Sequence, residues 1–226
     1  MLINYFKNIH KYVVYIGFIL YSSIGLAGSY EDFFNAIRND EVKVISNLFA
    51  RGFDPNTVDL NGEPAILHSL RHESFKVFEL IVKHPKTQVN VRNSHGESAL
   101  MLVSLKGELE LAKTLIKRDA DINHPGWTPL HYAATGGQTA IINLLLEESA
   151  YIDAESPNGT TPLMMAARYG NGKAVQLLIN EGADLHLKNH LGLSAIDFAV
   201  TGQRPDAIQL LHTALKLNNA PKSNSK

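Results

Sequence analysis

The chain has 226 residues, 45% of them hydrophobic, so it is long enough for one sizeable core or for an array of repeats. Its formal net charge of −1 provides no basic surplus, which argues against a nucleic acid as partner. The absence of cysteine excludes disulfides, thiolate catalysis and Cys-ligated metal sites.

The first 27 residues have the layout of a secretory signal peptide. Lys7 and Lys11 form a positively charged start, an apolar run follows, and the small residues Gly25 and Ala27 precede a cleavage site that we place after Ala27. The apolar run, from Tyr12 to Leu26, is about 15 residues long, shorter than the ~20 that span a bilayer. This length favours cleavage over the alternative of an uncleaved membrane anchor. We therefore expect a periplasmic or secreted protein with no stable membrane span once the signal is removed.

The rest of the chain contains a repeat that a glycine marks. The marked positions are Gly62, Gly96, Gly126, Gly159 and Gly192, with spacings of 34, 30, 33 and 33 residues. A polar loop, which we call a finger, carries each glycine, and a short apolar segment, a break and a longer amphipathic segment follow it. A helix pair of this kind cannot bury its apolar stripe alone, whereas stacked copies bury it between them. The pattern therefore predicts a helical repeat array.

Two of the units have closely similar sequences. Residues 126–137 read GWTPLHYAATGG and residues 158–170 read NGTTPLMMAARYG. Thr128 can cap the first helix, and Pro129 suits its first turn, where the missing N–H has no cost. Gly137 and Gly170 are predicted to end the first helices in the left-handed conformation. The second helices carry apolar stripes such as Ile141, Leu144 and Leu145.

These residues resemble the ankyrin repeat family, whose signature includes T-P-L-H-x-A at a period of 33 residues. The resemblance implies an all-α repeat solenoid, a stack of helix–turn–helix units with β-turn fingers, in a bacterial exported or periplasmic protein. It also implies that His131 bridges turns by hydrogen bonding. The expected boundaries are an N-terminal cap at 30–56, repeats at 57–90, 91–123, 124–154 and 155–187, a C-terminal cap at 188–216 and a disordered tail at 217–226.

One finger is shorter than the rest. Asp121 and Gly126 are five positions apart, whereas Asp184 and Gly192, at the corresponding places, are eight apart. The shortened finger directly precedes Trp127, the only tryptophan in the chain. Two interpretations stay open: Trp127 folds down into the space that the missing residues leave, or it belongs to a binding surface.

Signatures of catalysis are absent from the sequence. Gly170 to Lys173 lacks the first glycine of a phosphate loop and has Ala174 where Ser or Thr is needed. His72-Glu73 has Lys76 where a zinc-protease helix has its second histidine, and no serine lies in a G-x-S-x-G elbow. The histidines are dispersed, without the spacing of a metal site. We therefore predict no catalytic, metal or cofactor site and no enzyme activity.

In the ankyrin family, partners dock on the fingers and on the exposed ends of the first helices, so the resemblance implies a binding surface at these positions. The leading cluster is Trp127, Arg168 and Tyr169, because Trp, Tyr and Arg most often anchor interfaces. The full set of expected partner-binding residues is Trp127, Arg168, Tyr169, Arg71, His72, Lys106 and Thr160. Tyr132, by contrast, is expected to pack within its helix.

The sequence as a whole predicts a non-enzymatic, monomeric module of the cell envelope that binds a protein partner through its fingers and concave face. Two alternatives have the same architecture: a protective or assembly factor for an exported enzyme, and a secreted effector that acts on host proteins.

Overall fold

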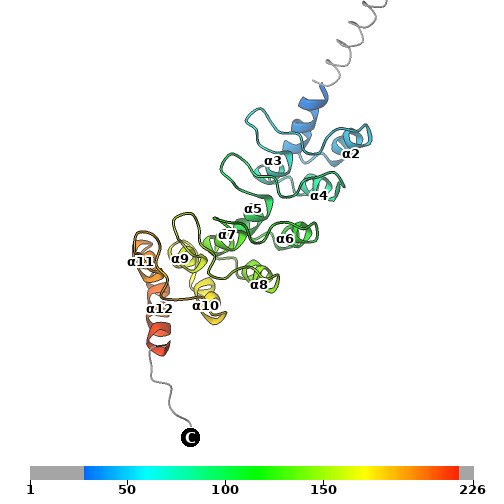
Figure 1. Cartoon of the computed structure of the whole chain (residues 1–226). Helices are drawn as coiled ribbons and strands as arrows, with labels where there is room; N and C mark the ends of the chain where they lie inside the picture. The colour runs from blue at the N-terminus through cyan, green and yellow to red at the C-terminus, as the bar shows by residue number, and fades with distance from the viewer. Residues whose placement is uncertain (1–27, 219–226) are drawn as a thin grey trace, which may run out of the picture. The chain divides into compact units, whose positions relative to one another are not determined.

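The computed structural model describes residues 28–218, which form helices joined by loops (Figure 1). The signal peptide expected at residues 1–27 and residues 219–226 of the expected tail lie outside the described residues. The described chain divides between Thr87 and Gln88 into two compact units. This division falls inside the repeat predicted at 57–90, where the sequence pattern had suggested one continuous array.

The first unit, residues 28–87, consists of two helix pairs. Residues 28–38 are helical and precede α2 (Val42–Ala50), and α3 (Ala65–Arg71) precedes α4 (Phe75–Lys83). Its core contains Phe33, Ile45 and Phe78, all completely buried. Asp40, in the left-handed conformation between the first two helices, accepts a hydrogen bond of 2.8 Å from the backbone of Val77, which ties one pair to the next.

The second unit, residues 88–218, consists of four helix pairs. Its inner helices are α5 (Ala99–Lys106), α7 (Pro129–Gly136), α9 (Pro162–Arg168) and α11 (Ala195–Thr201), and its outer helices are α6 (Leu109–Ile116), α8 (Thr139–Glu147), α10 (Gly172–Asn180) and α12 (Pro205–Asn218). Each inner helix packs against the next inner helix, and each outer helix against the next outer one. Within residues 28–218 the only β-pairing consists of isolated bridges at two fingers. The predicted all-α repeat solenoid is therefore confirmed.

Each inner helix of this unit begins with the same hydrogen bond, although three different kinds of side chain make it. The third helical residue accepts from the backbone N–H of the N-cap residue: His131 Nδ1 at 3.2 Å, Asp197 Oδ2 at 2.7 Å, and the Sδ atoms of Met101 and Met164 at 3.4 Å. Because an N-cap N–H has no partner inside the helix, any acceptor at this position favours the helix start. Proline at the first helical position of α7 and α9 adds to this, as predicted.

The glycines that follow two inner helices have different reasons for being glycine. Gly137 ends α7 with a φ of 67°, the left-handed conformation that the sequence predicted. The same prediction is wrong for Gly170, which does not have a positive φ. A Cβ at Gly170 would lie 2.5 Å from the carbonyl oxygen of Ala134 and 2.9 Å from that of Ala166. Gly170 is therefore needed because a neighbouring inner helix approaches its backbone closely.

The outer helices bury a stripe rotated slightly from the predicted one. In α8 the buried residues are Ile141, Ile142 and Leu145, while Leu144 is half-buried. The last outer helix, α12, continues through Asn218, so the tail predicted from residue 217 starts at least two residues later. Among residues 28–218, no helix combines the length and apolarity that crossing a membrane requires.

Candidate functional site

The regular fingers of the second unit are hairpin turns built on one polar side chain. In the last finger, Asn189 N donates to Leu193 O at 3.0 Å, and Asn189 Oδ1 accepts from the backbone N–H groups of Leu191 and Leu193, both at 3.0 Å. Asn93 holds the second finger in the same way, whereas in the fourth finger Ser156 Oγ accepts from Thr160 N and donates to Asn158 Oδ1. A side chain that imitates a backbone turn in this way makes the finger rigid.

The short finger, residues 123–128, lacks this turn. Asn123 Nδ2 donates to Ser149 O at 2.8 Å and its Oδ1 accepts from Tyr151 N at 2.9 Å, which is the role that Asn90 has one repeat earlier. Three residues after Asn90 comes Asn93, the polar residue of the second finger, but three residues after Asn123 comes Gly126. The missing residues are therefore those of the turn itself. Between residues 123 and 127 no hairpin hydrogen bond forms, which confirms the predicted stunted finger.

Trp127, near the end of this short finger, is half-buried. Its ring meets the ring of His131 edge-on, with the centroids 5.2 Å apart and the planes at 73°. His131 is completely buried and is held from both sides: Nδ1 accepts from Thr128, and Nε2 donates to Thr160 O at 2.9 Å. This hydrogen bond joins the third repeat to the fourth finger. Trp127 therefore packs on a side chain that hydrogen bonds hold in place. The structure agrees in part with each of the two interpretations: one part of the Trp127 side chain is buried against His131, and the other part is exposed.

The exposed part of Trp127 lines a hollow on the inner helices. We call this cavity of about 190 Å³ the Trp127 hollow; its lining residues are Leu105, Trp127, Tyr132, Thr135 and Met165. They come from α5, the short finger, α7 and α9, so three successive repeats contribute. The Tyr132 hydroxyl donates to Glu97 Oε1 at 3.4 Å. Burial, followed by the nearby Glu97 carboxylate, raises the pKa of Tyr132 to about 12, so this phenol stays neutral.

The other predicted residues of the leading cluster lie at the end of α9. Arg168 Cζ is 5.0 Å from the centre of the Tyr169 ring, and 52% of Tyr169 is exposed. Both residues come within one helical turn of Met165, so they continue the surface of the Trp127 hollow along α9. Lys106 is exposed directly after Leu105, at the end of α5. The structure thus brings Trp127, Lys106, Arg168 and Tyr169 to the inner face.

Of the other three predicted residues, one is buried and two belong to the first unit. Thr160 was expected to contact a partner, but it is 2% exposed and its carbonyl oxygen accepts hydrogen bonds from His131 and from Ser156 N. That prediction is corrected, because the base of the fourth finger is packed. Arg71 and His72 are exposed at the end of α3 in the first unit, where Arg71 Nε donates to Glu63 Oε1 at 2.7 Å.

Sequence reasoning missed Tyr132 and Met165. Tyr132 was expected to pack within α7, yet it is half-buried and lines the hollow. Each of these residues is the fourth after its N-cap, Thr128 or Thr161, so the two occupy the same register position in successive repeats. The constant register of the repeats was the signal that could have located them.

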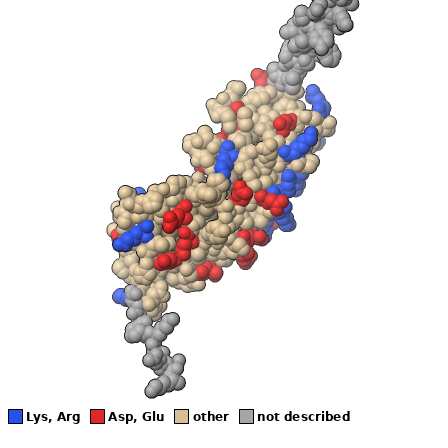
Figure 2. Space-filling view, in the orientation of Figure 1, with Lys and Arg blue, Asp and Glu red and all other residues tan. Residues whose placement is uncertain are grey.

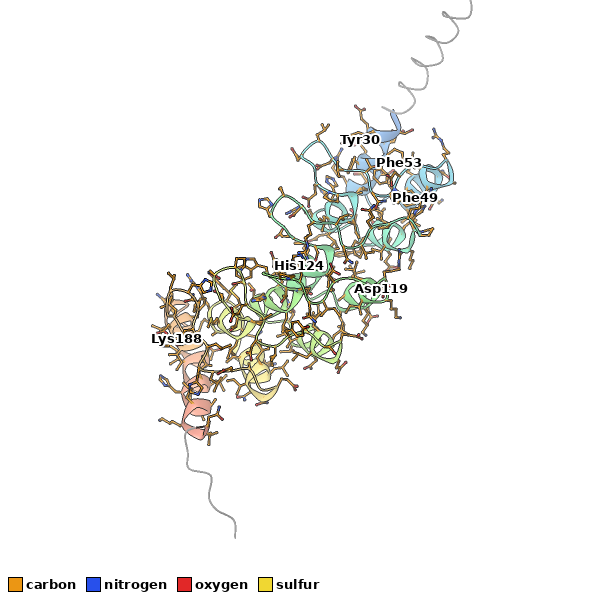
Figure 3. All side chains as sticks on the ribbon, in the orientation of Figure 1. Tyr30, Phe49, Phe53, Asp119, His124 and Lys188 are labelled. Carbon is orange, nitrogen blue, oxygen red and sulfur yellow. The ribbon has the colours of Figure 1, made fainter. Side chains whose placement is uncertain are left out.

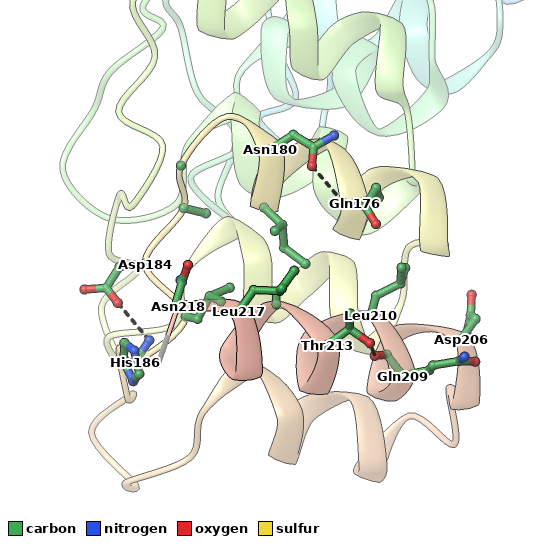
Figure 4. A pocket seen from close by; sticks show the side chains of 15 residues that line it. Gln176, Asn180, Asp184, His186, Asp206, Gln209, Leu210, Thr213, Leu217 and Asn218 are labelled. Atoms are coloured by element: carbon green, nitrogen blue, oxygen red, sulfur yellow. Dashed lines mark hydrogen bonds between the residues drawn. The ribbon is translucent and has the colours of Figure 1, made fainter. Parts of the chain in front are cut away.

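Two further hollows lie elsewhere on the described chain. In the first unit, a cavity of about 390 Å³ is lined by residues that include Arg38, Asp59 and His68, with His68 Nδ1 3.2 Å from Asp59 Oδ2. Burial lowers the pKa of His68, which is 7% exposed. In the second unit, an open groove of about 870 Å³ runs between α10 and α12, past Ile179, Leu210 and Leu217 (Figure 4).

Charged side chains of both signs lie on the face drawn in Figure 2, with Lys and Arg most prominent along the upper right edge. Side chains project from all helices and fingers, including His124 in the short finger and Lys188 in the last one (Figure 3). Within residues 28–218, no cluster of three or more His, Asp or Glu has the geometry to hold a metal ion.

Replacement of His131 by Met gives a test of the contact that supports Trp127. Methionine occupies the same position in α5 and α9, so His131→Met keeps an acceptor for the N-cap but loses the donor to Thr160 O. At pH 7 we expect a loss of about 1 kcal/mol in the free energy of unfolding, measured by urea denaturation.

The same pair of proteins should respond differently to acid. Burial lowers the pKa of His131 from 6.5 to about 4, so the unfolded chain takes up a proton before the folded chain does. The neutral, buried His131 therefore contributes its full share to the free energy of unfolding above pH 6.5. This contribution decreases as the pH falls toward 4, and at pH 5 it is smaller by about 1–2 kcal/mol. The advantage of wild type over His131→Met should shrink or vanish by pH 5; a constant difference would contradict this role of His131.

Comparison with known proteins identifies the class to which this architecture belongs. The family model described as ankyrin repeats (3 copies) matches residues 33–125, 79–156, 123–189 and 152–220. These matches cover most of the chain, which therefore belongs to the ankyrin repeat family. Repeats of this family generally mediate protein–protein interactions and are non-enzymatic.

Individual relatives match parts of the chain. An ankyrin repeat and SAM domain-containing protein 6 from Rattus norvegicus is 31% identical over 109 residues, which are 46% of this chain and 12% of that protein. The nuclear factor NF-kappa-B p105 subunit of Gallus gallus is 30% identical over 55% of this chain and 13% of its own length. A Notch-regulated ankyrin repeat-containing protein of Xenopus laevis is 35% identical over 40% of this chain and 75% of its own length. The chain thus spans only about an eighth of the first two relatives.

Proposed function

We propose that this protein is a non-enzymatic binding module that holds a protein partner at the Trp127 hollow and the adjoining Arg168–Tyr169 pair. The observation that carries the proposal is a half-buried tryptophan, fixed on a rigid base, that lines an open and mainly apolar hollow across three repeats. Interfaces of proteins are most often anchored by Trp, Tyr and Arg in such surroundings. A partner would exclude water from this surface without any rearrangement of the inner helices.

We further propose that the protein works as a monomer outside the cytoplasm, in the periplasm or as a secreted protein of the cell envelope. Support for export comes from the charged start, the short apolar run and the small residues before Ala27. The partner is accordingly expected among exported proteins.

Site-specific photo-cross-linking in intact cells tests this function. A photoreactive amino acid replaces Tyr169 in the full chain, and in a control it replaces Asn143, which is exposed on the outer helix α8. We expect one discrete adduct from position 169, recovered from the exported fraction, and none of that mass from position 143. The additional substitution Trp127→Ala should remove the adduct.

The same experiment can refute the proposal. Equal adducts from positions 169 and 143 would mean that the inner face has no special role. An adduct that persists with Trp127→Ala would separate binding from the hollow, and an adduct confined to the cytoplasmic fraction would contradict the location.

A further inference from the structure

We propose that the Trp127 hollow receives one large apolar side chain from an extended, acidic segment of the partner protein, and that a carboxylate of this segment lies against Arg168. This inference rests on the proposed function and specifies the chemistry of the segment that binds.

The size and lining of the hollow match one apolar side chain. A cavity of about 150 Å³ holds a benzene molecule, so the open hollow of about 190 Å³ can take one aromatic or branched aliphatic group. Its two hydroxyl groups have already donated their protons, Tyr132 to Glu97 and Thr135 to the backbone oxygen of His131. Burial of an apolar group against these two hydroxyls therefore leaves neither of them without an acceptor.

The charges around the hollow favour an acidic segment. Arg168 ends α9, one helical turn after Met165, which lines the hollow. Arg168 lies over the ring of Tyr169 rather than against a carboxylate. Glu97, the acid that Tyr132 contacts, already accepts hydrogen bonds at both oxygens, from Tyr132 and from Asn93 at 2.8 Å. A partner with negative charge complements this rim.

The short finger favours an extended segment. Regular hairpins stand on either side of it, at residues 93–97 and 156–160, and the turn between them is missing. In the proposed complex, the backbone of the segment crosses the row of fingers here, beside Trp127. In an extended chain, side chains two residues apart share a face and are about 6.6 Å apart. This spacing is close to the ~5–6 Å between Met165 and the next turn of α9, where Arg168 lies.

The segment can be identified with a random library of displayed 12-residue peptides, selected on the immobilised full chain. We expect enriched peptides to carry one large apolar residue with Asp or Glu two positions away on at least one side. A synthetic, fluorescently labelled copy of the best peptide should lose affinity about three- to fivefold when Arg168→Gln is introduced, and the loss should fade at high salt. The matched control Lys173→Gln removes an exposed cation from the start of α10 and should leave affinity unchanged.

Two further variants separate this inference from the proposed function. Trp127→Ala should lower the affinity for the peptide by about tenfold or more. Leu105→Glu, at a residue that is 36% exposed and therefore compatible with folding, should repel the acidic peptide from the hollow. Circular dichroism of each variant checks that it is folded.

The outcomes are distinguishable. Enriched peptides without acidic residues, or equal effects of Arg168→Gln and Lys173→Gln on affinity, would overturn the inference. If such peptides still lose affinity with Trp127→Ala, the proposed binding site remains supported. Peptides insensitive to both Trp127→Ala and Leu105→Glu, together with no adduct at position 169, would overturn the proposed function as well. A library without enrichment would overturn the inference alone, because the cross-link at position 169 decides the function independently.

Discussion

Leu145→Ala is expected to lower the free energy of unfolding by about 2–5 kcal/mol. Leu145 lies in the outer helix α8 and is completely buried. Its side chain belongs to the stripe that α8 presents to its neighbours α6 and α10, so truncation leaves a cavity between repeats rather than within one. Urea unfolding followed by circular dichroism measures the loss.

The damage should spread beyond the mutated repeat. Because neighbouring units share their stability in a stacked array, hydrogen exchange should accelerate in α6 and α10 as well as in α8. Asn143→Ala, two residues away on the exposed side of the same helix, is the matched control and should change stability by less than about 0.5 kcal/mol. Faster exchange confined to α8 would contradict a shared core.

Gly170→Ala should destabilise the protein and Gly172→Ala should not, although only two positions separate them. At Gly170 the added methyl group would lie 2.5 Å from the backbone oxygen of Ala134, so an inner helix must move. Overpacking of this kind typically costs about 1–3 kcal/mol, and we expect the upper end because the obstacle is backbone. At Gly172, the first residue of α10, the nearest atom is a side-chain oxygen of Asp206 at 3.0 Å, which can rotate away.

Gly172→Ala should therefore be neutral or stabilising by up to about 1 kcal/mol, because alanine restricts the unfolded chain and favours a helix. Thermal and urea unfolding of both variants provide the comparison. Equal destabilisation by the two substitutions would show that Gly170 is not selected by close helix packing. The fluorescence of Trp127 also shows whether a change at Gly170 reaches the hollow: an unchanged spectrum would mean that it does not.

The fold could be predicted from the sequence because its cause is local and repeated. The T-P-L start, the glycine period and the apolar stripes each specify part of one unit, and their recurrence specifies stacking. The shortened finger was also visible, since a missing turn changes a spacing that can be counted. The prediction of a left-handed conformation failed for Gly170. A glycine required by a close neighbouring backbone and a glycine required by a positive φ look the same in the sequence.

The binding surface could be predicted only in part. Trp127, Lys106, Arg168 and Tyr169 lie on the inner face where the repeat pattern suggested, although their role in binding stays a prediction. Thr160 occupies an equivalent finger position but is buried, because the ring of His131 reaches across to its carbonyl oxygen. Such a contact joins residues 29 positions apart and depends on how one repeat is seated on the next.

The sequence by itself determined the repeat unit, its helix starts and the place where the array omits a turn, because these depend on neighbouring residues along the chain. Only the tertiary structure decided that Trp127 is half-buried on His131, and that Leu105, Tyr132 and Met165 meet beside it. The physical reason is that this hollow is formed by three repeats, and a surface shared by three repeats depends on their stacking distance and rotation. Around Trp127 the inner helices follow the regular repeat pattern, whereas the finger lacks its turn. The hollow depends on both features.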